Sequence, residues 1–104
     1  MKELLTKRIL FTTLLPKLWD RMRQDGLQPV KGVDGEKHMP GSLHYIGLAD
    51  DTSLYDKDGN WLNTTEAHQP YGEWWEQQHP DCRWGGRFKK PDGNHYSIAF
   101  QGKA

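Results

Sequence analysis

Four residues in two distant segments of the chain could together perform metal-dependent hydrolysis. The first segment contains His44 and Asp51, and the second contains Asp92 and His95. Two imidazoles and one carboxylate are a typical ligand set for catalytic zinc, because three protein ligands leave the fourth tetrahedral position open. Reactions at zinc occur at that open position, so we expect His44, Asp51 and His95 to bind a zinc ion at a hydrolytic site.

The spacing within each segment constrains how these side chains can meet. His44 and Asp51 are seven positions apart, so an unbroken strand would point them to opposite faces. Gly47 lies between them and permits the bend that would bring both to one metal. Asp92 and His95 are three positions apart across a turn, which would leave Asp92 beside His95 without binding the metal. A general base for hydrolysis would occupy that position.

Each residue also has an ordinary structural interpretation. A single histidine near a strand is commonly a hydrogen-bonded structural residue. Asp51 could cap the end of a strand, and Asp92-Gly93 is a common turn signal. Only the combination of the two segments favours a metal site.

The order of these motifs resembles that of a known enzyme family. The pattern S-x-H-x-x-G-x-A-x-D is followed by W-G-G and then by D-x-x-H. The matching residues are Ser42, His44, Gly47, Ala49 and Asp51, then Trp84–Gly86, then Asp92 and His95. This order is similar to the VanY-like zinc DD-carboxypeptidase and L-alanyl-D-glutamate endopeptidase family, and most similar to its small phage and prophage endolysins. The likeness extends from about Thr12 to Phe100.

The resemblance implies one zinc ion bound by His44, Asp51 and His95. It implies that Asp92 is the catalytic base, which deprotonates the attacking water and then protonates the leaving amine. Ser42 matches the family's motif serine and would orient the site through hydrogen bonds. The implied substrate is the stem peptide of bacterial peptidoglycan, and the implied fold is that of hedgehog and DD-peptidase domains.

Three further residues are weaker site candidates. Trp84 could form a wall of the cleft or pack in the core, and the two glycines after it would allow a tight turn. Arg87 could reach the substrate or belong to a solvated basic edge. His38 could contact substrate or lie in an ordinary glycine-rich loop.

The segment between Lys31 and Ser42 departs from the family pattern. Relatives have an arginine and a glutamine there that hold a substrate carboxylate, whereas this chain has no arginine in the segment. The alternatives are Lys31 or Lys37 from the segment itself, Arg83 or Arg87 from elsewhere, or weakened substrate binding. Asp50 is the rival to Asp51 as a metal ligand. The spacing of the family's motif selects Asp51, whereas the family usually has an apolar residue at the position of Asp50.

Local patterns predict two helices. Apolar residues recur at helical spacing over 13–25, with Pro16 tolerable only in the first turn, and Gly26 is a plausible end. A second helix is expected over 66–78, with caps offered by 63–66. We expect His68 and His79 on the surface of the protein, and Cys82 as a small buried hydrophobic residue.

Strands are expected over 27–31, 45–51 and 95–100. In the last of these, Tyr96, Ile98 and Phe100 should face the core, with the intervening residues on the opposite face. Short helices together with antiparallel strands favour an α+β fold with a short antiparallel sheet and two main helices.

Composition limits the chain to one small domain, residues 1–104. Only 35% of its residues are hydrophobic, but 12% are aromatic, and these large rings can build much of a core. The chain has 14 basic and 14 acidic residues, a balance that argues against binding nucleic acid. No apolar run is long enough to span a membrane. We therefore expect a monomer.

The expected localisation follows from the absence of a signal-peptide pattern. Ile9–Leu15 is apolar but is interrupted by Pro16 and Lys17 and has no suitable cleavage site. We expect synthesis in a bacterial host cytoplasm and action at the cell wall after holin release or lysis.

The leading functional hypothesis is a peptidoglycan endopeptidase that cuts between L-Ala and D-Glu. One alternative within the same chemistry is a DD-carboxypeptidase that removes the terminal D-Ala. The other is a zinc-stabilised binding module without catalysis, which the short segment between Lys31 and Ser42 motivates.

Overall fold

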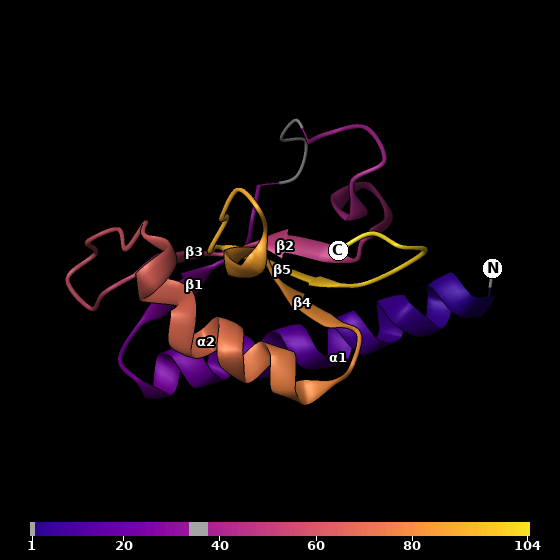
Figure 1. The fold of residues 1–104 in the computed structure, drawn as a ribbon. Coiled ribbons are helices and arrows are strands. Elements are labelled where there is room, and N and C mark those ends of the chain that lie inside the picture. The colour runs from indigo at the N-terminus through magenta and orange to yellow at the C-terminus, as the bar shows by residue number, and fades with distance from the viewer. Residues whose placement is uncertain (1, 34–37) are drawn as a thin grey trace.

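The computed structural model describes residues 2–33 and 38–104, and over these ranges the chain is an α+β domain (Figure 1). Its helices are α1 (Lys2–Gln24) and α2 (Thr65–Gln78), and its short 3-10 turns are η1 (Leu43–Ile46) and η2 (Gly85–Arg87). Its strands are β1 (Gln28–Val30), β2 (Ala49–Asp51), β3 (Ser53–Tyr55), β4 (Cys82–Trp84) and β5 (His95–Ile98). The predicted fold class is confirmed.

The strands form two small antiparallel sheets. One contains β1 and β3, and the other has the order β2-β5-β4, with β5 in the centre. Both helices lie on the same side of the strands, with α2 against β4 and α1 reaching β1 and β5 (Figure 1). The remaining side of the larger sheet carries η1 and the loops of the candidate site.

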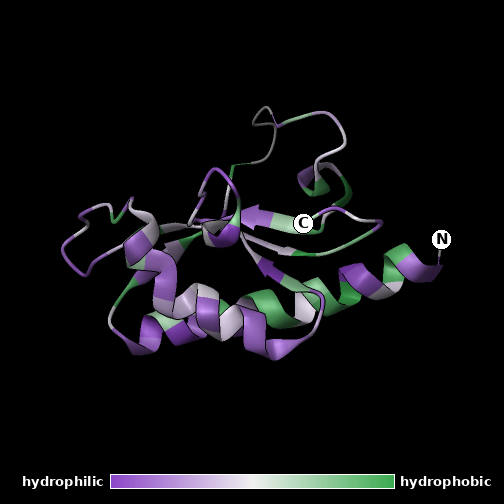
Figure 2. Cartoon of the chain, in the orientation of Figure 1, coloured by the Kyte–Doolittle hydropathy of each residue, from purple (hydrophilic) through white to green (hydrophobic). Residues whose placement is uncertain are grey.

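Large aromatic rings build the centre of the core, as composition predicts. Trp75 and Tyr96 are fully buried, and the Trp75 ring makes edge-to-face contacts with both Phe11 and Tyr96. The Trp75 indole Nε1 donates to the carbonyl oxygen of Ser97 at 3.1 Å, which ties α2 to the central strand. Hydrophobic residues recur along α1, whereas the visible face of α2 is mostly hydrophilic (Figure 2).

The first helix begins earlier than predicted. It starts at Lys2 rather than near Thr13, so Pro16 lies in its interior and not in its first turn. The residues that precede Thr12 are mainly Lys, Glu, Leu and Arg, which favour helix. Pro16 removes the hydrogen bond to the Thr12 carbonyl, but both residues are exposed, so water can solvate that group. The second helix is confirmed, and Thr64 Oγ1 caps it by accepting from the Ala67 N–H.

The strand predictions are confirmed only in part. The segment predicted as one strand over 45–51 is divided into η1 and β2. The predicted strand over 95–100 ends at Ile98, and all four of its residues are buried, so its faces do not alternate between core and solvent. The reason is tertiary: β5 is the central strand, and both its faces are covered. The strands β3 and β4 were not predicted.

Trp84 packs in the core, where it fills the space left by two glycines. An added Cβ at Gly72 or at Gly86 would overlap the Trp84 ring. Gly85 and Gly86 were predicted to allow a tight turn after Trp84, but neither of them has a positive φ. These glycines are required for space rather than for backbone conformation.

His68 is buried, so its expected surface position is wrong. Its side chain is 2% exposed, and its Nδ1 lies 2.8 Å from the Tyr96 hydroxyl oxygen. His79 is half-buried, and its Nδ1 accepts from the Asp81 N–H. Cys82 is buried as predicted, and burial raises the pKa of its thiol to about 12, so it is unreactive.

Neither helix of the described part of the chain is long and apolar enough to cross a membrane.

The contact between Gly72 and Trp84 gives a stability prediction. We expect Gly72→Ala to lower the free energy of unfolding by about 1 to 3 kcal/mol, because the new methyl group displaces a buried indole. Urea unfolding measures this change. Gln77→Ala, at an exposed position on the same helix, is the control and should alter stability little. Equal stability of the two variants would contradict the prediction.

Burial of His68 gives a second prediction. It lowers the pKa of the imidazole from 6.5 to about 4, so the unfolded chain binds this proton first as pH falls. The free energy of unfolding should therefore decrease as pH falls from about 6.5 to 4. We expect His68→Gln to reduce this decrease by up to about 3 kcal/mol, measured by urea unfolding of metal-free protein at several pH values. If the free energy of unfolding of the wild type and of His68→Gln changes with pH in parallel, His68 does not cause the decrease.

Candidate metal centre

The 3-10 turn η1 places His44. Ser42 precedes the turn, and its Oγ accepts from the His44 N–H at 3.2 Å, so Ser42 orients the backbone of this residue. Gly47 ends the turn with φ of 74°, in the left-handed region that favours glycine. The chain therefore reverses between His44 and β2, which is the bend that the sequence predicted.

The pairing of β2 with β5 places the other two predicted ligands. Asp51 and His95 are directly opposite each other in this antiparallel pair, so their side chains point to the same face. The pairing continues one residue further, where the Thr52 N–H donates to the Asn94 carbonyl oxygen at 2.9 Å. Two segments that are distant in sequence are thus held in one register.

Three ligand atoms converge at this point. Nε2 of His44 lies 3.3 Å from Oδ1 of Asp51 and 3.3 Å from Nδ1 of His95, and these last two atoms are 3.4 Å apart. Tetrahedral zinc has ligands at about 2.0 to 2.2 Å, which places any two ligand atoms about 3.3 to 3.6 Å apart. The triangle formed by His44, Asp51 and His95 therefore has the size that zinc requires.

The hydrogen bonding of the triangle also fits a cation. Oδ1 of Asp51 is buried and has no hydrogen-bond partner within the described residues. Buried polar atoms of this kind normally have a partner, and a metal ion would supply one. Burial opposes ionisation of Asp51, but His44 and His95 more than offset it, and they hold the pKa of this carboxyl well below its usual range. Asp51 is therefore ionised, as a metal ligand must be.

Asp92 lies beside the triangle in the turn before β5. Its ligand oxygen is within 4.8 Å of the ligand atoms of Asp51 and His95. Its N–H donates to the Gly85 carbonyl oxygen at 2.9 Å, and an added Cβ at Gly85 would overlap the Asp92 carbonyl oxygen. Burial raises the pKa of Asp92, and the charge of Asp51 raises it further. A carboxylate with a raised pKa is a better proton acceptor.

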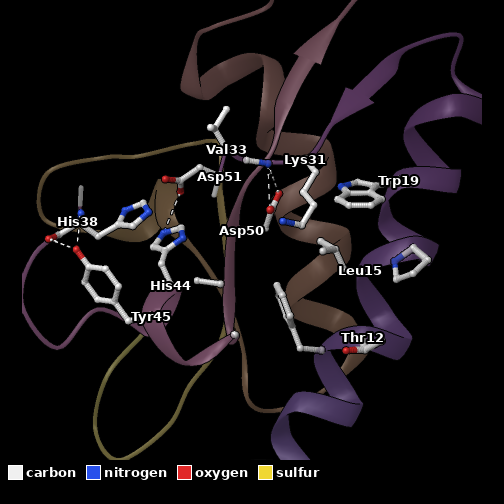
Figure 3. Close-up of a pocket in the computed structure, with 15 residues that line it drawn as sticks. Thr12, Leu15, Trp19, Lys31, Val33, His38, His44, Tyr45, Asp50 and Asp51 are labelled. Atoms are coloured by element: carbon white, nitrogen blue, oxygen red, sulfur yellow. Dashed lines mark hydrogen bonds and ion pairs between the residues drawn. The ribbon is translucent and has the colours of Figure 1, made fainter. Parts of the chain in front are cut away.

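A cavity of about 570 Å³ opens beside His44 and Asp51 (Figure 3). One wall comes from α1 and is mostly apolar. It includes Phe11, Leu15, Pro16 and Trp19. The opposite wall carries the metal-ligand candidates and loop residues, so a bound peptide could place an apolar side chain against α1 and its backbone near the triangle.

Asp50 has a structural role that the sequence did not reveal. It is buried and points to the opposite side of β2 from Asp51, where the Gly32 N–H and the Thr52 hydroxyl donate to its carboxylate at 3.1 and 2.7 Å. The Thr52 hydroxyl oxygen in turn accepts from the Trp19 indole N–H at 3.1 Å. This network joins α1, β2 and the segment after β1. Lys31 lies near Asp50, and its charge opposes the rise in the pKa of Asp50 that burial causes.

His38 stacks on His44. The two rings are parallel, with an interplanar angle of 3° and centroids 3.7 Å apart (Figure 3). The Tyr45 hydroxyl fixes this position, because it accepts from the His38 N–H and donates to the His38 carbonyl oxygen, both at 2.9 Å. His38, His44 and Asp51 form a second group of possible ligands within 4.8 Å. His38 therefore packs against the His44 ring and is also close enough to contribute a nitrogen to the same group of ligands.

The other two weak candidates lie away from the cavity. The Trp84 indole Nε1 donates to the Gly93 carbonyl oxygen at 2.7 Å, so this buried side chain holds the turn that carries Asp92. Arg87 is exposed and binds the carboxylate of Glu76 at 3.1 Å. Of the cations proposed to replace the family's arginine, Lys31 lines the cavity, Arg83 and Arg87 do not, and Lys37 lies outside the described residues.

Several residues that shape the site were not identified from the sequence. Phe88 lies against His95, with ring centroids 5.1 Å apart, and Tyr45 fixes His38. Thr52 connects Asp50 to Trp19. Phe88 and Tyr45 are aromatic residues close to the motifs, which was the one available signal. Thr52 gave no signal, because its contact with Trp19 spans 33 positions of sequence.

A comparison of the chain with models of known protein families finds no match, and a comparison with curated proteins finds none either.

The triangle predicts that zinc stabilises the folded protein. Zinc at one hundred times its dissociation constant should raise the midpoint of thermal unfolding by on the order of 10 °C. Asp51→Asn should abolish most of this rise, because the amide carries no charge. Asp58→Asn, in the exposed turn after β3, is the matched control and should keep the rise. Scanning calorimetry with and without zinc measures it, and an equal rise in all three proteins would contradict the site.

Proposed function

We propose that this protein is a zinc-dependent peptidase that hydrolyses stem peptides of bacterial peptidoglycan, with the L-Ala–D-Glu bond as its substrate. The observation that supports this most is the triangle of His44, Asp51 and His95, with Asp92 beside it and a cavity of about 570 Å³ at its edge. The motifs that resemble the endolysin family supply the same four residues.

In this proposal, His44, Asp51 and His95 hold one zinc ion. When bound, zinc would supply Lewis-acid chemistry that would polarise the scissile carbonyl group and lower the pKa of water. The ligand atoms come from a 3-10 turn and two paired strands, so the protein fixes their positions before substrate binds.

Asp92 moves the proton in this mechanism. A carboxylate oxygen of Asp92 accepts a proton from the attacking water, and the same oxygen then donates it to the nitrogen of the leaving amine. The proton is conserved, and the peptide bond is exchanged for a carboxylic acid and an amine. The raised pKa of Asp92 supports both steps, because it brings the acid and base forms closer to equal at neutral pH.

Among the described residues, the cavity offers one cation, Lys31, for a substrate carboxylate. A carboxypeptidase must hold the free carboxylate at the end of its substrate, and a cation commonly serves this purpose. Among the described residues that line the cavity, Lys31 is the only lysine or arginine, and its charge already acts on Asp50. The L-Ala–D-Glu bond makes a similar demand, because D-Glu keeps one free carboxylate beside the scissile bond, so the reaction products distinguish the two activities.

The role of Asp92 gives a direct test. We expect Asp92→Asn to bind zinc as the wild type does and to lose about 10²- to 10⁴-fold in the rate of muropeptide hydrolysis, because the amide cannot accept the proton. Zinc content by elemental analysis and product masses by mass spectrometry measure the two properties. Asp58→Asn is the control and should keep both.

Three outcomes would overturn the proposal. Purified wild-type protein that binds no zinc at neutral pH would remove its basis. Release of free D-alanine would instead establish a carboxypeptidase. Tight zinc binding without hydrolysis of any peptidoglycan would indicate a binding module.

A further inference from the structure

A second cavity is lined in part by Asp92, the residue that lies beside the metal-ligand triangle. It has a volume of about 210 Å³, and we call it the Trp61 cavity. One wall is formed by the residues that directly follow Asp51, and another by the 91–94 turn that precedes His95. The Trp61 cavity and the metal centre are therefore built on the same two segments of chain, and Asp92 belongs to both.

Trp61 presents a large aromatic surface at this cavity. Its side chain is 61% exposed, although an indole is among the side chains that gain most from burial. Its backbone is fixed, because it forms a β-bridge with Tyr55, and the next residue, Leu62, donates its N–H to the Leu54 carbonyl oxygen at 2.8 Å. The connection from β3 to α2, which carries Trp61, stands beside the start of α2 (Figure 1). An exposed ring at a cavity edge, carried by a backbone that these contacts fix, is suited to stacking on a ligand.

The remaining lining is polar and mostly neutral. The side chains of Ser53, Asn63 and Asn94 have no hydrogen-bond partner among the described residues, so their donors and acceptors are available. His68 is at the buried end, where its Nδ1 faces the Tyr96 hydroxyl and its Nε2 has no partner in the described ranges. No lysine or arginine among the described residues lines the cavity, which disfavours a phosphate or a nucleotide.

We propose that the Trp61 cavity binds one saccharide ring, with a face of the ring stacked on Trp61 and its hydroxyl or amide groups bound by Asn63 and Asn94. Sugars have apolar C–H faces and polar edges, and this combination matches an exposed indole surrounded by neutral amides. A volume of about 210 Å³ accommodates a single ring rather than a chain.

The identity of the saccharide rests on the proposed function, under which it is an N-acetylated amino sugar of the glycan strand. The first stem residue, L-Ala, is joined to this sugar through a lactyl group, so the L-Ala–D-Glu bond is about two residue lengths, or roughly 7 Å, from the sugar ring. Because Asp92 lines the cavity, a sugar bound there would lie next to the proton acceptor. The terminal D-Ala is several residues away, so a bound sugar would not place that bond at the site.

Binding can be measured without any reference to catalysis. The probe is chitotetraose, an oligomer of N-acetylglucosamine, added to the full chain with zinc while the indole resonances are followed by NMR. We expect saturable shifts of the Trp61 indole and at least tenfold weaker binding in Trp61→Ala, with most affinity kept in Trp61→Phe. Ile9→Ala, an exposed apolar position on α1, is the control and should bind as the wild type does. Absence of Trp61 shifts, or equal shifts with maltotetraose, would overturn the inference.

Catalysis gives an independent measurement. We expect the ratio of kcat/KM for a glycan-linked stem peptide to that for the free stem peptide to fall at least fivefold in Trp61→Ala and to stay unchanged in Ile9→Ala. Hydrolysis with an unchanged ratio in both variants would overturn the saccharide site and leave the proposed function intact. Conversely, chitotetraose binding at Trp61 in a protein that hydrolyses no peptide would support the saccharide site and overturn the proposed function.

Discussion

The pairing of Asp51 with His95 across β2 and β5 is the contact on which the candidate metal centre depends. It joins two segments separated by more than forty positions and points both side chains to one face. A register shift of one residue would turn one of them to the opposite face and remove it from the triangle. The neighbouring bond from Thr52 to Asn94 and the central place of β5 keep this register fixed.

The opposite face of β2 provides the support that the triangle needs. Asp50 is buried there and, with Thr52, connects β2 to Trp19 on α1 and to Gly32 after β1. Neighbouring aspartates in one strand thus have separate tasks, because alternate residues of a strand face opposite sides. One offers a charge to a cation, and the other anchors the strand within the domain.

The turn before β5 places Asp92 beside the metal-ligand triangle and in the lining of the Trp61 cavity. The Gly85 carbonyl oxygen accepts from the Asp92 N–H, and the Trp84 indole N–H donates to the Gly93 carbonyl oxygen. These two bonds from η2 and β4 therefore define where the Asp92 carboxylate lies. The larger cavity continues from the triangle towards α1, and the smaller continues towards Trp61 and α2. This arrangement suits a substrate with two parts, a peptide and a sugar, joined close to the reacting bond.

The sequence by itself determined which residues meet in the candidate site and the α+β class. His44, Gly47, Asp92 and His95 were identified from residue type and spacing, because ligand chemistry and backbone conformation are local properties. The choice of Asp51 over its neighbour Asp50 came from the motif spacing of the family that the chain resembles. Both helices and the strand after the first of them were also predicted. The start of α1 was missed, because the tolerance of Pro16 depends on solvent around Thr12.

Tertiary structure alone decided the rest. The burial of His68, the anchoring by Asp50 and the stacking of His38 on His44 depend on partners brought together by the fold, as does the cavity at Trp61. A carboxylate or an imidazole has the same local sequence signal whether it is exposed, bound to a metal or buried as an anchor. Only the packing of distant segments determines which of these environments it occupies.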